Sequence, residues 1–173
     1  DKKNLSLIRS AFNILDDEIK RKVTIVLLGK PSRKSDFEFC ESWKSDAGDS
    51  LIYFNEFVSD EVFSDYMEES DCILGVLNIN YFDKYNAEIY GLSKDTGIDA
   101  QAISYGKPLI INNDFNVINE IISSTLKFHD EKSLAACIFA LEDNVYMNNI
   151  SDEAILNCNK LSLDKVISNL VNI

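Results

Sequence analysis

The sequence predicts an α/β protein of the Rossmann-like class, in which helices cover both faces of a parallel sheet in three layers (α/β/α). Short apolar runs such as KVTIVLL (22–28) and LIIN (109–112) alternate with segments of helical periodicity. Runs of this kind, rich in β-branched residues, are typical of strands buried on both faces. Strands that alternate with helices favour βαβ units and a parallel sheet. The 173 residues suit a single domain, 1–173, that folds without disulfides.

The first half of the chain predicts helices with recognisable caps. Apolar residues recur at helical spacing from Leu5, with Asn4 as N-cap, and predict a first helix of about four turns. Ser59 is placed to cap a later helix whose first turn is acidic. The other elements expected in this half are a strand at 22–28, a helix at 36–44, and strands at 51–54 and 72–77.

The second half opens with a long polar and aromatic segment, residues 78–94. A connection of this length is unusual in a compact domain unless it is functional, and its aromatic residues favour a binding loop over a disordered linker. These aromatic residues are Tyr81, Phe82, Tyr85 and Tyr90. The elements expected after it are a helix at 97–105, strands at 109–112 and 126–128, helices near 115–123 and at 132–141, and terminal helices over about 149–172, in segments 151–158 and 162–171.

Charge and cysteine spacing exclude several classes of function. A net charge of -12 repels phosphate backbones and anionic lipids, so no nucleic-acid partner is expected. No apolar stretch is long enough to cross a membrane directly. The four cysteines lack a C-x-x-C spacing, and His129 has no ligand at metal-binding spacing, so we expect neither a metal nor a cofactor. A reduced, cytoplasmic protein follows.

Ligands of doubly wound sheets bind outside the carboxyl ends of the strands. The loop after the first strand, Gly29-Lys30-Pro31, matches neither a dinucleotide fingerprint nor a P-loop. Thr96-Gly97 precedes the predicted 97–105 helix, with Thr96 as N-cap and Gly97 allowing close approach of a ligand. Because a helix N-terminus presents amides and partial positive charge, this segment suits a diphosphate. An ordinary capped helix explains the same pattern.

Four stretches, taken in order, resemble a known family. They are Lys3-Asn4 before LSLIRSAFNIL (5–15), the strand VTIVLLG (23–29), the segment LIYFNEFVSDEVFSDYMEESD (51–71), and QAISYGKPLI (101–110). Together they resemble the C-terminal, donor-binding domain of a group 1 (GT-B fold) glycosyltransferase. The resemblance covers nearly the whole chain, and each motif is degenerate.

The resemblance implies a role for each matching position in binding a nucleotide-diphospho-sugar donor. Lys3 and the backbone of Thr96, Gly97 and Ile98 would hold the diphosphate. The segment Asn55, Glu56, Phe57 and Val58 would frame the nucleobase, with Glu56 in place of the family's glycine.

Two positions depart from the family's paired-glutamate motif. Gln101 stands where the family has the glutamate that binds the ribose, and Ser93 stands at the partner glutamate. An amide still bonds a diol, although without the strength of a charge-assisted bond. No catalytic residue is assigned.

The resemblance also implies an activity. The enzyme would transfer a sugar from a UDP- or GDP-sugar to a glycan or other acceptor, in polysaccharide or glycoconjugate biosynthesis. Because such enzymes bind donor and acceptor between two domains, and this chain opens on Asp1-Lys2-Lys3, an N-terminal acceptor domain of the same chain is expected to precede it. The chain by itself would then be inactive. The full-length protein would act in the cytoplasm, including the inner face of the membrane.

Two other interpretations stay open. SDCILGVLNIN (70–80) and GKPLIIN (106–112) also resemble nucleoside 2-deoxyribosyltransferases and related nucleotide-processing enzymes. Their glutamate nucleophile would fall on Ile98, with Asp99 one residue out of register. A non-catalytic, receiver-like binding module would instead need an acidic pair after the first strand, where this chain has Gly29-Lys30-Pro31.

Overall fold

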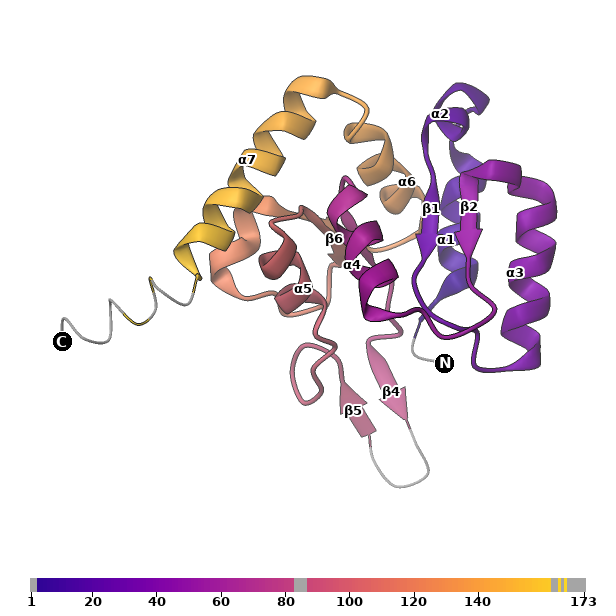
Figure 1. The fold of residues 1–173 in the computed structure, drawn as a ribbon, viewed down its shortest axis with the longest axis horizontal. Helices are drawn as coiled ribbons and strands as arrows, with labels where there is room; N and C mark the ends of the chain where they lie inside the picture. The colour runs from indigo at the N-terminus through magenta and orange to yellow at the C-terminus, as the bar shows by residue number, and fades with distance from the viewer. Residues whose placement is uncertain (1–2, 83–86, 163–164, 166, 168–173) are drawn as a thin grey trace. The chain divides into compact units, whose positions relative to one another are not determined.

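The computed structural model describes residues 3–82, 87–162, 165 and 167 (Figure 1). The chain forms two compact units, a smaller unit (Phe12–Glu69) and a larger unit (Asp1–Ala11 with Ser70–Ile173). Helix α1 (Leu5–Ile14) begins in the larger unit and ends in the smaller one. Both units combine parallel strands with flanking helices, which is consistent with the Rossmann-like three-layer α/β/α class and confirms the predicted fold class.

The smaller unit is built around one βαβ unit. Its parallel strands are β1 (Ile25–Leu27) and β2 (Leu51–Tyr53), with Ile25 paired to Leu51. Its helices are α2 (Asp17–Lys22), α3 (Lys34–Ala47), the short 3₁₀ helix η1 (Gly48–Ser50) and α4 (Asp60–Glu69). Helix α3 connects the two strands and packs against β2. As predicted, Ser59 caps α4, since its Oγ accepts a hydrogen bond from the amide of Val62.

The core of the smaller unit gathers around Trp43 of α3, which is 1% exposed. Its ring meets Phe12 edge-on, with the ring centroids 6.3 Å apart. Lys44, the next residue, donates from Nζ to the carbonyl of Leu51 at 2.7 Å and so ties the end of α3 to the start of β2. These contacts hold the start of β2 against α3.

The larger unit contains a parallel sheet of three strands in the order β3 (Ile73–Gly75), β6 (Leu109–Asn112), β7 (Thr125–Phe128). Leu109, Ile110 and Ile111 of the central strand are all buried. Because successive side chains of a strand point to opposite faces, both faces of this sheet are covered. Helix α5 (Ile98–Tyr105) packs against β3, and α6 (Glu131–Ala140) packs against β7. Helix α7 (Asn144–Lys160) packs against η2 (Asn119–Ser124) and α5.

The segment 78–94, predicted to be a loop, contains a β-hairpin, so the predicted absence of strands was wrong, whereas its binding role stays a prediction. Strands β4 (Asn80–Phe82) and β5 (Ala87–Ile89) pair antiparallel and project from the rest of their unit (Figure 1). Three-residue strands are too short for a period-2 pattern to be recognised in sequence. Tyr90 is buried and belongs to the core, Phe82 is exposed, and Tyr85 lies outside the described residues.

Three helix predictions also differ from the structure. Asn4 caps α1 as expected, accepting from the amide of Leu7, but the helix ends at Ile14 because Asp16 caps the new helix α2. The helix expected near 115–123 is the 3₁₀ helix η2, preceded by the buried side chains of Phe115 and Val117. Helix α7 is longer than the predicted 151–158, and the predicted helix at 162–171 lies mostly outside the described residues.

Candidate functional site

A pocket of about 490 Å³ opens in the smaller unit at the carboxyl end of β2. The strand stops at Tyr53, and the chain turns through a short loop before Ser59 starts α4. This loop supplies most of the wall. The residues that line the pocket are Tyr53, Phe54, Asn55, Glu56, Phe57, Val58, Ser59 and Val62. All four positions predicted to frame a nucleobase are among them.

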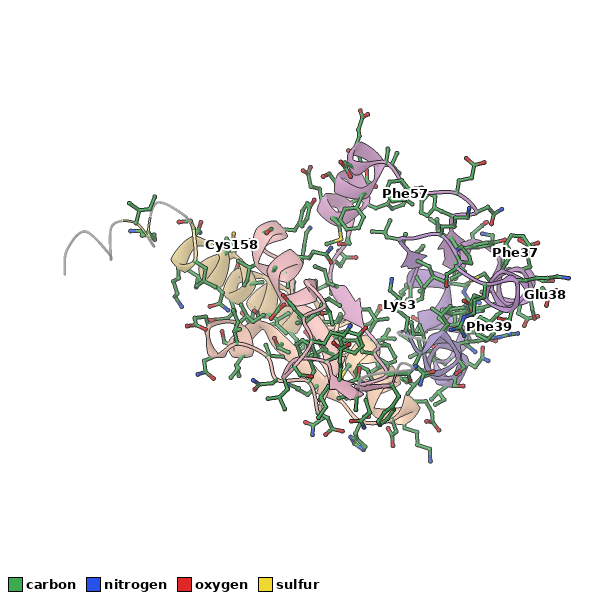
Figure 2. All side chains as sticks on the ribbon, turned by 90° about the horizontal axis from the view of Figure 1, so that it is seen from below. Lys3, Phe37, Glu38, Phe39, Phe57 and Cys158 are labelled. Carbon is green, nitrogen blue, oxygen red and sulfur yellow. The ribbon has the colours of Figure 1, made fainter. Side chains whose placement is uncertain are left out.

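Two of the aromatic residues that line this pocket pack edge-on against other rings. Tyr53 meets Phe37 of α3 edge-on at 6.5 Å, and Phe54 meets Tyr66 of α4 edge-on at 5.5 Å. Phe57 is 85% exposed and stands on the loop with no such ring partner among the described residues (Figure 2). Val58 is buried and anchors the loop. An exposed ring at the edge of a pocket suits the face of a planar ligand.

The pocket is electrically negative. Among the described lining residues, Glu56 carries the charge, and Asp60 and Glu61 follow in the first turn of α4. The sequence holds no lysine or arginine from residue 45 to residue 83. A pocket of this kind favours hydrogen-bond donors and repels phosphate.

In the larger unit, the predicted diphosphate residues lie around the carboxyl end of β3. Lys3 forms an antiparallel bridge with Leu77, and the amide of Asn4 donates to the carbonyl of Val76 at 3.0 Å. Lys3 is exposed, yet nearby protein atoms exclude water from its ammonium group and lower its pKa. The chain therefore holds a cation beside this strand end.

Asn112, the last residue of β6, links the carboxyl ends of β6 and β3 through a hydrogen bond. Its side-chain oxygen accepts a hydrogen bond from the amide of Leu77 at 2.8 Å, so the end of β6 is tied to the segment after β3. The sequence analysis missed this role. The signal was a polar residue at the end of the apolar run LIIN, where an amide side chain is positioned to bond a neighbouring strand.

Helix α5 begins beside β3. A Cβ atom at Gly75 would come within 2.6 Å of Ile98 Cδ1, so the glycine leaves the space that Ile98 occupies. Ile98, where the deoxyribosyltransferase hypothesis needs a carboxylate, thus packs on the strand. Asp99 accepts from the amide of Ala100 in its own helix.

The N-cap of α5 is Gly97, in the left-handed conformation with φ of 68°, and not the predicted Thr96. The Thr96 hydroxyl accepts from the amide of Ile98 at 3.2 Å, and Asp95 accepts from the amide of Gly97 at 2.9 Å. The chain's own side chains therefore occupy these two amides. A diphosphate that binds them has to replace both acceptors, one of which is a carboxylate.

Ser93 and Gln101 have different surroundings. The Ser93 hydroxyl accepts from the amide of Ile89 at 2.8 Å and so closes the end of the hairpin. Gln101 is half-buried one turn into α5. The ten predicted donor residues thus form two groups, with Asn55–Val58 in the smaller unit and Lys3, Ser93, Thr96–Ile98 and Gln101 in the larger unit.

Comparison with known proteins assigns no family to this chain: no protein-family model matches it, and no curated protein matches its sequence significantly. Within the described residues, no group of three histidine, cysteine, aspartate or glutamate side chains is placed to hold a metal ion. Among the helices of the described part, none has the length and apolar character that crossing a membrane requires.

Proposed function

We propose that this chain binds a nucleotide-diphospho-sugar and is the donor-binding domain of a glycosyltransferase, which transfers a sugar from a UDP- or GDP-sugar to a glycan or other acceptor. The observation that carries the proposal is the pocket after β2. It lies at the carboxyl end of a parallel strand, where α/β folds bind ligands. It also contains Asn55–Val58, the segment that the family resemblance assigns to the nucleobase.

The pocket has the chemistry of a base site and not of a phosphate site. Phe57 offers an exposed ring face, and Asn55 offers an amide with both donors and an acceptor. Stacking of a base on an aromatic ring contributes about 1–3 kcal/mol. Because Glu56 gives this pocket negative charge, the diphosphate of the donor belongs elsewhere.

The diphosphate is assigned to Lys3 and the start of α5. In sugar transfer the nucleoside diphosphate is the leaving group. The Lys3 ammonium beside the end of β3 would neutralise part of its phosphate charge. The Gly97 turn brings backbone close to a ligand, since nothing lies within 4 Å of the position a Cβ would take there. Gln101 would bond the donor's hydroxyl groups as a neutral amide.

Titration of the ¹⁵N-labelled chain with UDP and with GDP tests the proposal. We expect chemical-shift changes at Asn55–Val58 and at Gly97, Ile98 and Gln101, larger than those at Cys137 and Ile150 of α6 and α7. Lys3→Ala should weaken binding of either nucleotide about 5- to 10-fold, because it removes one charge-assisted contact.

The matched control is Lys30→Ala, which removes an exposed lysine after β1 and should leave the affinity unchanged. Shift changes confined to the turn from Gly29 to Arg33 would mean that the diphosphate site is wrong. Absence of any change at millimolar nucleotide would refute the proposed function.

A further inference from the structure

The pocket after β2 contains a carboxylate at the place assigned to a base. Glu56 lines the pocket between Asn55 and Phe57. It is exposed, and none of the described residues forms a salt bridge or hydrogen bond with its side chain. Because lysine and arginine are missing from 45–83, local sequence provides no cation to neutralise it. Its oxygens are therefore available to a ligand.

An ionised carboxylate accepts hydrogen bonds and donates none. Its two oxygens pair best with two neighbouring N–H donors, and guanine presents such a pair on one edge, the ring N1–H and the exocyclic 2-amino group. Uracil presents one N–H between two carbonyl oxygens, which a carboxylate repels. Adenine and cytosine each place a single amino group beside an unprotonated ring nitrogen. A site built to accept from two N–H groups favours the ligand that supplies both over one that supplies a single N–H.

We propose that the pocket is a guanine site in which Glu56 accepts hydrogen bonds from N1–H and the 2-amino group, so that the donor is a GDP-sugar. This inference rests on the proposed function, since it selects among the donors that the function allows. Phe57 supplies the ring face for stacking, as its side chain is exposed on the same loop (Figure 2). The negative field of Asp60 and Glu61 strengthens the preference for the donor edge of guanine.

Affinities of the unmodified chain for four diphosphates test the inference without any mutation. The probes are GDP, UDP, inosine diphosphate, which lacks the 2-amino group, and xanthosine diphosphate, which has a carbonyl in its place. Titration calorimetry at one salt concentration should show GDP binding about 10- to 100-fold more tightly than UDP. Inosine diphosphate should fall between them, because it keeps N1–H alone. Xanthosine diphosphate should bind weakly.

The variant Glu56→Gln tests the inference because it should change the preferred base from guanine to xanthine. A glutamine side chain accepts from N1–H and donates to a carbonyl, which fits xanthine and not guanine. The variant should lose about tenfold in GDP affinity and gain in xanthosine diphosphate affinity. Glu69→Gln, at the last residue of α4, is the matched control, since it makes the same chemical change at an exposed position outside the pocket lining and should keep the preference for GDP.

The outcomes distinguish failure of the guanine assignment from failure of the proposed function. Equal affinity for GDP and UDP, or tighter binding of UDP, would overturn the guanine assignment and leave nucleotide-sugar binding intact. Unchanged GDP affinity in Glu56→Gln, with the far-UV circular dichroism of the unmodified chain, would overturn it as well. If none of the four diphosphates binds, the proposed function fails and the guanine site fails with it.

Discussion

Asp95 decides how readily the start of α5 accepts an anion. Its carboxylate accepts from the amide of Gly97 at 2.9 Å, while the Thr96 hydroxyl accepts from Ile98. A diphosphate therefore competes with a negative charge that the chain itself places at this helix end. The helix dipole favours either anion by similar amounts, so the local carboxylate lowers the net gain from binding phosphate.

We expect Asp95→Asn to raise the affinity for GDP or UDP about two- to fivefold, which corresponds to the 0.3–1 kcal/mol of a charge at a helix terminus. Asparagine keeps an oxygen that accepts from Gly97 but carries no charge. Calorimetry at 50 mM and 500 mM salt should show the gain shrinking at high salt, because screening removes it. Asp152→Asn, on α7, is the control. Weaker binding by the Asp95 variant would indicate that the carboxylate supports the site.

Lys3 gives the proposed diphosphate contact a pH dependence. Partial exclusion of water lowers the pKa of its ammonium group from 10.5. The charged form binds phosphate, so affinity should fall as pH rises through this lowered pKa, and the fall should begin below pH 10.5. In Lys3→Arg the guanidinium stays protonated, so affinity should fall less over the same range than in the unmodified chain. Identical pH profiles of the two proteins, measured by calorimetry from pH 7 to pH 10, would contradict a role for Lys3.

At the scale of elements, the β4–β5 hairpin ends in a crowded turn. Gly91 adopts φ of 80° and donates from its amide to the carbonyl of Lys94 at 2.9 Å. A Cβ at this position would lie 2.9 Å from the backbone nitrogen of Asn116 and 3.0 Å from the ring of Phe115. Conformation and space both require glycine here, and the turn sets where the segment leading to α5 begins.

Gly91→Ala should lower the free energy of unfolding by about 2–4 kcal/mol, because backbone strain and overpacking act together. Gly106→Ala is the matched control. That glycine ends α5 with φ of 58°, and the nearest atoms to its Cβ position lie at 3.7 Å, an ordinary contact. Its replacement should lower the free energy of unfolding by about 1 kcal/mol, because backbone strain acts alone. Urea denaturation of the three proteins measures both values, and equal losses would show that the contact with Asn116 and Phe115 relaxes freely.

For the whole molecule, the proposed function assigns the base and the diphosphate to different units. Asn55–Val58 belong to the smaller unit, whereas Lys3 and the start of α5 belong to the larger one. The net charge of -12 opposes the approach of an anionic donor to either unit. Favourable contacts with the donor therefore have to offset this repulsion.

We expect the 173-residue chain alone to transfer no sugar. In the proposed enzyme the acceptor is held by another domain, and such positioning contributes several kcal/mol to lowering the barrier. The test incubates the purified chain with radiolabelled GDP- and UDP-sugars and a panel of oligosaccharide acceptors. Nucleotide binding without transfer agrees with the proposal. Robust turnover would show that this chain contains a complete active site.

The sequence by itself determined the class of fold and most of its elements. The apolar run LIIN predicted β6 to the residue, and Asn4 and Ser59 were correctly expected to cap α1 and α4. These features depend on residues within one or two turns of each other, so local periodicity and capping chemistry suffice to predict them. The order of strands and helices indicated parallel pairing for the same reason.

The tertiary structure alone decided what surrounds each candidate site. The bond from Leu77 to Asn112 joins residues far apart in the chain, and the burial of Tyr90 depends on the packing around it. The pocket after β2 is lined by residues 53–59 and 62, but its shape follows from how this turn folds. The acceptors at the start of α5 depend on the conformation of the Asp95–Gly97 turn, which an N-cap pattern does not specify. Sequence periodicity predicts which side chains are buried, but it does not predict which residues they contact. That choice follows from packing and hydrogen bonding between distant segments.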